Sequence, residues 1–433
     1  MEIGKALTGF FQIEERGTTL RTEIIAGTTT FLAMAYIIFV NPGILAAAGM
    51  DKTALITVTC LVTALATCLT GIVANAPIAM APGMGLNAFF AYSLVLTEKI
   101  RWETALGIVF LSGLFFFLLT ISGARKKIVE VIPRTLISAT AAGIGLFITF
   151  IGLINLGVIK KNDATILAAG PVTPTVLIGF TGFLVMAVLE MKRVKGSMIL
   201  GILTAALLAL LTGKIAWPAA FFSLDLRLSP IAFRLDILGA FKWSFAGAIF
   251  TLMFMDLFDS IGSLVACCHQ AKLTDEKGNI RGLDRLLSLD ATATMLGAVF
   301  GTSTTTTFIE STTGIEQGGR TGFTSVTTAV WFLLALLLTP LIEIVPVYAT
   351  APALILVGFF MMKEIRNIDF SDMEEGFPAF VIIVMIALSY SIATGLAFGF
   401  LSFVIFKMIR LKFREIKPAM WAIASLSILH FLL

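Results

Sequence analysis

Three acidic residues in apolar surroundings are the positions of this sequence best placed to do chemistry. Asp256 and Asp259 lie three residues apart within the mostly apolar stretch 245–266. If this stretch is a helix, the two carboxylates project from neighbouring positions of one face, near Ser260 and Ser263. An ionised carboxylate in a membrane costs roughly 3 kcal/mol on insertion scales, so both acids are candidates to carry a proton or bind a polar ligand. Alternatively, nearby hydroxyls satisfy them and they serve only helix packing.

The third acid, Glu310, lies in the stretch 301–319, which reads GTSTTTTFIESTTGIEQGG. The β-branched, hydroxyl-rich run before it favours extended structure over helix. Thr307 and Glu310 fit a capping box, so we expect a short helix to begin there and to end at Gly318 and Gly319. Its free N–H groups and positive partial charge would be available to a polar ligand. The alternative is that Glu310 only caps this helix.

A second interrupted stretch lies in the first half of the chain. Residues 76–92, APIAMAPGMGLNAFFAY, carry prolines and glycines directly before Asn87. We expect Asn87 to cap a short helix, and its amide, which both donates and accepts, suits a planar heterocyclic ligand. Phe258 could stack on a ring, although packing is the common role of Phe in a chain with 37 of them. Paired broken segments, one in each half, are the best sequence pointer to a transporter's binding site.

The elements that position these residues belong to an all-α polytopic membrane protein. Of the 433 residues, 58% are hydrophobic and 13% are charged, against about 25% charged in soluble proteins. Apolar stretches near 20 residues recur from end to end, and we expect about fourteen transmembrane segments, of which 78–97 and 302–318 are broken. Lipid tolerates such irregular backbone only inside protein or beside a cavity. The apolar tail 419–433 either lies at the membrane interface or packs on the bundle.

The two halves of the chain echo each other. The broken segment is third in each set of seven, and the next segment ends at the related sequences Val129–Pro133 and Ile342–Pro346. Because seven is odd, a duplicated unit would enter the membrane in the opposite sense, as in many secondary transporters. We therefore expect a first seven-span repeat at 1–243 and a second, inverted repeat with the apolar tail at 244–433. Chance recurrence of the short motif is the alternative.

The charges of the loops predict the orientation. With fourteen segments, more than two thirds of the 31 Lys and Arg residues fall on the side of the amino terminus. Both termini are therefore expected in the cytoplasm. The amino-terminal segment does not fit a signal peptide, because charged residues at 14–16 directly follow a short apolar stretch.

Other functions fit these residues less well. A hydrolase would need a nucleophile motif, yet neither Gly-x-Ser-x-Gly nor His-Glu-x-x-His occurs, and His269 and His430 are expected near membrane edges. The run Cys267-Cys268-His269 does not have zinc-site spacing, so we expect no metal, and nucleic acid is not an expected partner. A carrier of anions or another small solute remains the alternative, although the charges placed at the site are acidic. A structural or receptor role would leave the three acids unexplained.

Several motifs in a fixed order resemble one transporter family. They are Thr18–Gly27, Ile38–Pro42, Gly83–Tyr92, Asp256–Ser260, Gly301–Ser311 and Gly318–Gly322. Together they are similar to the adenine/guanine/hypoxanthine permeases, the AzgA-like branch of the nucleobase–cation symporter and nucleobase–ascorbate transporter superfamily, which is xanthine/uracil permease-like. The similarity covers nearly the whole chain. Cys267-Cys268-His269 departs from it, because small apolar residues are expected there.

The resemblance implies both an architecture and an activity. A core domain at about 22–122 and 244–344 would move against a gate domain at about 135–212 and 351–410, in an elevator-like motion. The activity would be uptake of a purine base with protons across the cytoplasmic membrane, with no cofactor besides the coupling proton. The sequence leaves the oligomeric state open, with a homodimer as one alternative. The candidate substrate-binding residues are Asn87, Asp259, Glu310, Gly85, Thr307, Ser311 and Phe258, and the candidate proton-coupling residues are Asp259, Glu310 and Asp256.

Overall fold

Apolar helices dominate the computed structural model of the chain, which describes residues 2–123, 133–218, 220–223, 226–274, 280 and 282–432. The motif residues Val129–Ile132 lie outside this part. The first half contains α1 (Glu2–Phe10), α2 (Leu20–Met34), α3 (Ile37–Ala46), α4 (Lys52–Ala74), β1 (Met80–Pro82), α5 (Met84–Ala88), the π-helix η1 (Phe89–Thr97), α6 (Trp102–Ile121), α8 (Arg134–Leu156), β2 (Ile159–Asn162), β3 (Ile166–Ala169), α9 (Pro174–Met191), α10 (Ser197–Leu211) and α11 (Ile237–Ala240).

The second half contains the remaining elements. They are the 3₁₀-helix η2 (Trp243–Phe245), α12 (Ala246–Gln270), α13 (Leu283–Phe300), β4 (Thr305–Thr307), α14 (Ser311–Glu316), α15 (Gly322–Ala335), α16 (Thr339–Glu343), α17 (Val347–Met362), η3 (Lys363–Asn367), α18 (Met373–Ser389), α19 (Ile392–Ile409), η4 (Phe413–Glu415) and α20 (Pro418–Leu432).

The expected class, a helical polytopic membrane protein, is confirmed. Within the described residues, eight helical stretches have the length and apolar composition needed to cross a membrane. Three further apolar helices, at 84–97, 197–211 and 322–335, are shorter than 18 residues. Of the expected segments that are not among the eight, those at 78–97 and 302–318 are broken, whereas α10 and α18 are unbroken but only 15 and 17 residues long.

Local side-chain contacts explain where several helices begin and end. Thr19 and Asp51 accept hydrogen bonds from backbone N–H groups in the first turns of α2 and α4, which are otherwise unsatisfied. Gly157 ends α8 with φ at 86°, a left-handed conformation that glycine adopts without strain. Lys52 donates to the carbonyls of Glu343 (3.0 Å) and Val345 (3.1 Å), so its cation lies at the negative carboxyl end of α16.

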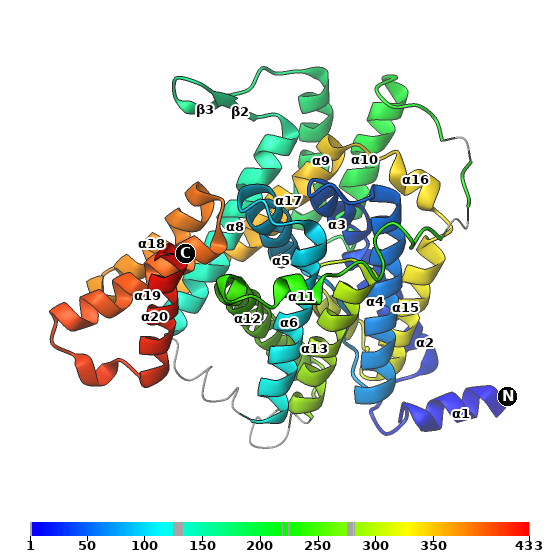
Figure 1. Ribbon diagram of the computed structural model, residues 1–433. Coiled ribbons are helices and arrows are strands. Elements are labelled where there is room, and N and C mark those ends of the chain that lie inside the picture. The colour runs from blue at the N-terminus through cyan, green and yellow to red at the C-terminus, as the bar shows by residue number, and fades with distance from the viewer. Residues whose placement is uncertain are drawn as a thin grey trace.

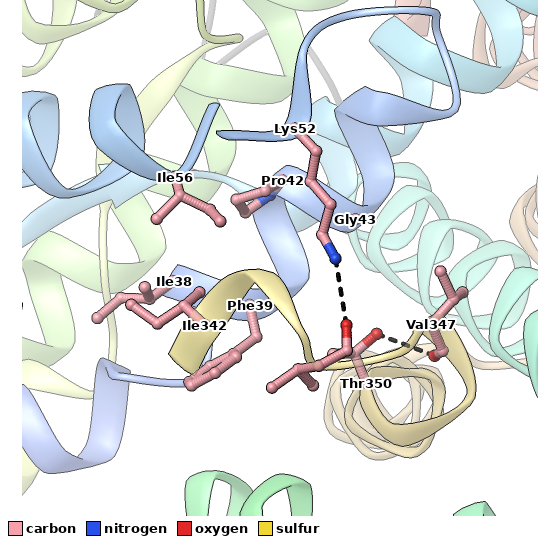
Figure 2. A pocket seen from close by; sticks show the side chains of 10 residues that line it. Ile38, Phe39, Pro42, Gly43, Lys52, Ile56, Ile342, Val347 and Thr350 are labelled. Atoms are coloured by element: carbon pink, nitrogen blue, oxygen red, sulfur yellow. Dashed lines mark hydrogen bonds between the residues drawn. The ribbon is translucent and has the colours of Figure 1, made fainter. Parts of the chain in front are cut away.

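The helices pack in two groups (Figure 1). In one group, α8 packs against α17 and α18, α18 against α19, and α9 against α10 and α17. In the other, α4 packs against α3, α13 and α15, α15 against α2, and α6 against α12 and α13. The groups meet where α12 contacts α19, where α10 contacts α2 and where α17 contacts α3. Figure 2 shows the last of these junctions, where Lys52 points toward the segment that joins α16 to α17.

The two broken segments meet in the interior of the protein. Strand β1 pairs antiparallel with β4, with Met80 opposite Thr307 and Pro82 opposite Thr305. All six strand residues are buried, and each strand is followed by a short helix, as the sequence predicted. The strands satisfy each other's backbone groups, which explains how extended chain survives in apolar surroundings.

The carboxyl-terminal tail packs on the bundle. Helix α20 lies along α19 and also contacts α12. Met420 and Ile423 of this helix are buried. Of the two expectations for the tail, packing on the bundle is the one observed.

Candidate functional site

The broken segments, helix α12 and the bend between α2 and α3 surround the predicted site residues. Helix α12 contacts β4, α14 and α5, and it carries both Asp256 and Asp259 near its middle. Glu310 immediately precedes α14, and Asn87 lies in α5. Residues far apart in the sequence are therefore brought to one region.

A chain of hydrogen bonds fixes the orientation of the Asn87 amide. The Thr59 hydroxyl donates to the carbonyl of Leu55 (2.6 Å), so it accepts from Nδ2 of Asn41 (2.7 Å). The Oδ1 atom of Asn41 must then face Nδ2 of Asn87, at 2.6 Å. Oδ1 of Asn87 is left fully buried and has no hydrogen-bond partner among the described residues. This oxygen can only accept, so it suits an N–H donor on a ligand.

Tyr36 holds the Glu310 carboxylate. Its hydroxyl donates to Oε1 of Glu310 at 2.8 Å, and the Tyr36 side chain is only 2% exposed. Tyr36 lies at the bend between α2 and α3, so the break in the first apolar stretch places it opposite α14. The second carboxylate oxygen of Glu310 remains available to another donor.

Asp259 faces an open space next to Glu310. The residue lies near the middle of α12, yet its side chain is exposed. One turn further on, a Cβ added at Gly262 would meet no atom within 4 Å, whereas most other helical glycines are tightly packed. Asp259 and Glu310 are close enough to interact electrostatically. Two acidic groups therefore lie together, Asp259 at the edge of an open space and Glu310 partly buried beside it.

Asp256 lies behind Asp259, inside the protein, and pairs with an acid that we did not predict. It is 1% exposed and accepts from the Thr294 hydroxyl at 2.9 Å. Asp256 also interacts electrostatically with Asp290 of α13, which is fully buried. Ser260, expected near Asp259, instead donates to Asp290 at 2.6 Å.

The remaining candidate residues have local partners. Thr307 donates to Asp290 through its backbone N–H (2.9 Å) and its hydroxyl (3.2 Å). Ser311 accepts from the N–H of Ala79 and donates to the carbonyl of Phe308. Both hydroxyls therefore hold the broken segments in place in this structure.

Gly85 and Phe258 lie at packed positions as well. A Cβ at Gly85 would come within 2.7 Å of Ile144, so this glycine lets α5 approach α8 closely. The Phe258 ring, which is partly buried, packs against Phe254 at 4.7 Å between centroids. A direct contact of either residue with a ligand stays a prediction.

Two capping predictions were wrong. Glu310 occupies the cap position of α14 but makes no side-chain capping bond, because Tyr36 binds its carboxylate and Asp290 binds Thr307. Gly83, not Asn87, occupies the cap position of α5, and the Asn87 amide turns to Asn41 instead. Both residues are therefore positioned by distant parts of the chain, which a local motif does not show.

Sequence reasoning missed Tyr36, Asn41 and Asp290. Asn41 and Asp290 are polar residues in apolar helices, and that pattern alone could have marked them. Tyr36 stands among apolar residues with no local signal. A single tyrosine in an apolar run is common, so only the fold identifies it.

Comparison with known proteins identifies the family of the chain. The sequence profile of the Permease family, the xanthine/uracil permeases, matches residues 21–398. The chain is 39% identical to the adenine permease AdeP of Escherichia coli, over 97% of this chain and 94% of the relative. It is 40% identical to the guanine/hypoxanthine permease PbuG of Bacillus subtilis, over 98% and 99%.

Solved structures with low sequence identity share the fold. The transmembrane domain of the cyanobacterium bicarbonate transporter BicA superposes with a TM-score of 0.66 at 15% identity, over 86% of this chain and 97% of that chain. The murine anion transporter Slc26a9 in the inward-facing state gives 0.63 at 11% identity, over 91% and 68%. The family match and the close relatives agree, so the chain belongs to the Permease family and is a multi-pass membrane permease rather than an enzyme.

Proposed function

We propose that this permease imports purine nucleobases, in symport with protons, across the cytoplasmic membrane. The observation that carries the proposal is the set of hydrogen-bond acceptors at the site: Asp259, Glu310 and the unpaired Oδ1 of Asn87. A purine base is a flat ring with several N–H donors. The names of the relatives, adenine permease and guanine/hypoxanthine permease, support the same class.

Binding would pair each acceptor with a donor of the base. Glu310, held by Tyr36, and Asp259 would accept from ring N–H or exocyclic amine groups. Asn87 would accept a further N–H once the base reaches α5. Sites of this kind reject analogues that lack a donor, because buried acceptors are then left unpaired.

The proposed proton carriers are Asp259 and Glu310, with Asp256 behind them. Two neighbouring carboxylates in low-dielectric surroundings cannot both be ionised without cost, so a proton taken up with the base would stabilise the loaded site. Release of that proton on the cytoplasmic side would weaken binding there and free the base.

The proposed motion is of elevator type. We assign fourteen spans in two inverted repeats, with both termini cytoplasmic, and take the helix group around α4, α6 and α13 as the core and the group around α8 and α17 as the gate. At the end of the bundle that carries Lys52, the two helix groups are joined by a hydrogen bond. There the hydroxyl of Ser93 in η1 donates to the carbonyl of Tyr390 at 2.6 Å. Toward the Gln270 end of α12, Gly262 and Ala266 are exposed. At the same end, however, Lys195 between α9 and α10 pairs with Glu316 of α14 at 2.9 Å, so the two groups are linked at both ends.

The test is uptake of radiolabelled hypoxanthine and adenine in a host that lacks other permeases. Glu310→Gln and Asp259→Asn should abolish saturable uptake, and a protonophore should collapse it in the unmodified protein. Glu103→Gln is the control, because Glu103 is an acid of α6 that pairs with Arg101 at the start of the same helix. Unchanged uptake in both site variants would reject the site. Uptake of an anion instead of any base would favour the alternative, a small-anion carrier on this fold.

A further inference from the structure

A large apolar groove on the bundle is separate from the site described above. It has a volume of about 460 Å³ and lies along α6 and the first half of α12. Phe115 and Leu119 form one wall, and Phe250 and Met253 form the other. All but one of the residues that line it are apolar. The exception is Lys242.

Water is a poor occupant of this groove. Each water in the groove would need polar partners that an apolar wall does not offer. The groove lies between two helices long and apolar enough to cross the membrane, α6 and α12, and Phe115 is 40% exposed. The acyl chains of the bilayer are therefore the adjoining solvent, and a chain that enters the groove makes dispersion contacts with no polar group left unsatisfied.

The rim of the groove has the chemistry of a lipid headgroup site. Lys242 is exposed and forms no ion pair among the described residues. Trp243 beside it is 72% exposed, and tryptophan is enriched where membrane meets water. Both precede α12, at the end of a long apolar helix where the interface is expected. A lysine at this level attracts anionic phosphates.

We propose that this groove binds one anionic phospholipid, with an acyl chain along Phe115 and Met253 and its phosphate at Lys242. The charge of Lys242 selects the headgroup, and the apolar walls retain the chain. The lipid lies against the first half of α12, the helix that also carries Asp256 and Asp259.

The test uses native mass spectrometry of the purified full-length protein, titrated with phosphatidylglycerol or phosphatidylcholine of equal chain length. The unmodified protein should retain one phosphatidylglycerol more strongly than phosphatidylcholine. Lys242→Gln should weaken phosphatidylglycerol about fivefold, the factor that one basic side chain contributes at an anionic lipid surface, and should leave phosphatidylcholine unchanged. Ala246→Trp, at the partly exposed rim, should displace both lipids.

The control is Lys214→Gln, which removes an exposed lysine elsewhere and should leave the preference intact. Equal retention of both lipids by the unmodified protein, or an equal loss in both lysine variants, would overturn the proposal. The proposal would also be overturned if the lipid-free protein were a dimer that Ala246→Trp converts to a monomer. In that case a second copy of the chain, and not a lipid, would fill the groove.

Discussion

The orientation of the Asn87 amide can be tested through residues that never touch a ligand. If Oδ1 of Asn87 accepts an N–H from the substrate, Asn87→Ala leaves that donor unpaired. An unpaired buried donor costs about 1–3 kcal/mol, which corresponds to about 5- to 150-fold weaker binding. Asn41→Ala and Thr59→Val act at one and two hydrogen bonds from Asn87. Asn87 donates to Asn41 at 2.6 Å, and Asn41 donates to Thr59 at 2.7 Å.

Each of these indirect changes should have a smaller effect. A net hydrogen bond contributes about 0.5–1.5 kcal/mol, so loss of the orienting bond should weaken binding about two- to twelvefold. The assay is equilibrium binding of hypoxanthine to purified protein, with initial uptake in cells as a second measurement. Thr57→Val is the matched control, because Thr57 is also a buried threonine of α4 but bonds only to the carbonyl of Thr53, at 3.4 Å.

Non-additivity is the decisive result. In an Asn87→Ala background, Asn41→Ala should cost nothing further, because residues in one hydrogen-bond chain are coupled. If the two losses simply add, or if Thr57→Val weakens binding as much as Thr59→Val, the argument that Asn41 and Thr59 act by orienting Asn87 is refuted.

Three further changes test contacts that hold the fold together. Lys52→Gln removes the donor to two backbone carbonyls and should lower the apparent melting temperature in detergent, whereas Lys161→Gln in the exposed β2–β3 hairpin should not. Gly314→Ala should prevent folding, because the added Cβ would lie 2.5 Å from the carbonyl oxygen of Ala26. Gly262→Ala is the control and should fold normally, because a Cβ there meets no atom within 4 Å. The size-exclusion profiles of the two purified variants test both expectations. Lys412 and Lys407 hold the pKa of Glu374 at about 2, below its ordinary 4.5. Stability from this carboxylate is therefore present above about pH 4.5 and lost as the pH falls toward 2, and Glu374→Gln should flatten that slope in thermal melts.

The sequence predicted the elements of the site better than the contacts between them. Asp256 and Asp259 were placed correctly on one helix, because apolar length and spacing are local properties. Asp256 is buried against α13, whereas Asp259 faces open space. This difference depends on Asp290, which lies some thirty residues further along the chain. The capping box at Thr307 failed for the same reason. A distant carboxylate offered a better partner than the local one, and no single sequence records such a competition.

The pairing of β1 with β4 has a consequence for biosynthesis. Pro82 and Thr305 are separated by more than 200 residues, which a ribosome needs roughly 10–40 s to add at about 5–20 residues per second. During this time the nascent β1 lacks the strand that satisfies its backbone in the membrane. The first half of the chain must therefore wait, shielded by the translocation machinery, water or its own helices, so truncated products should be unstable and rapidly degraded.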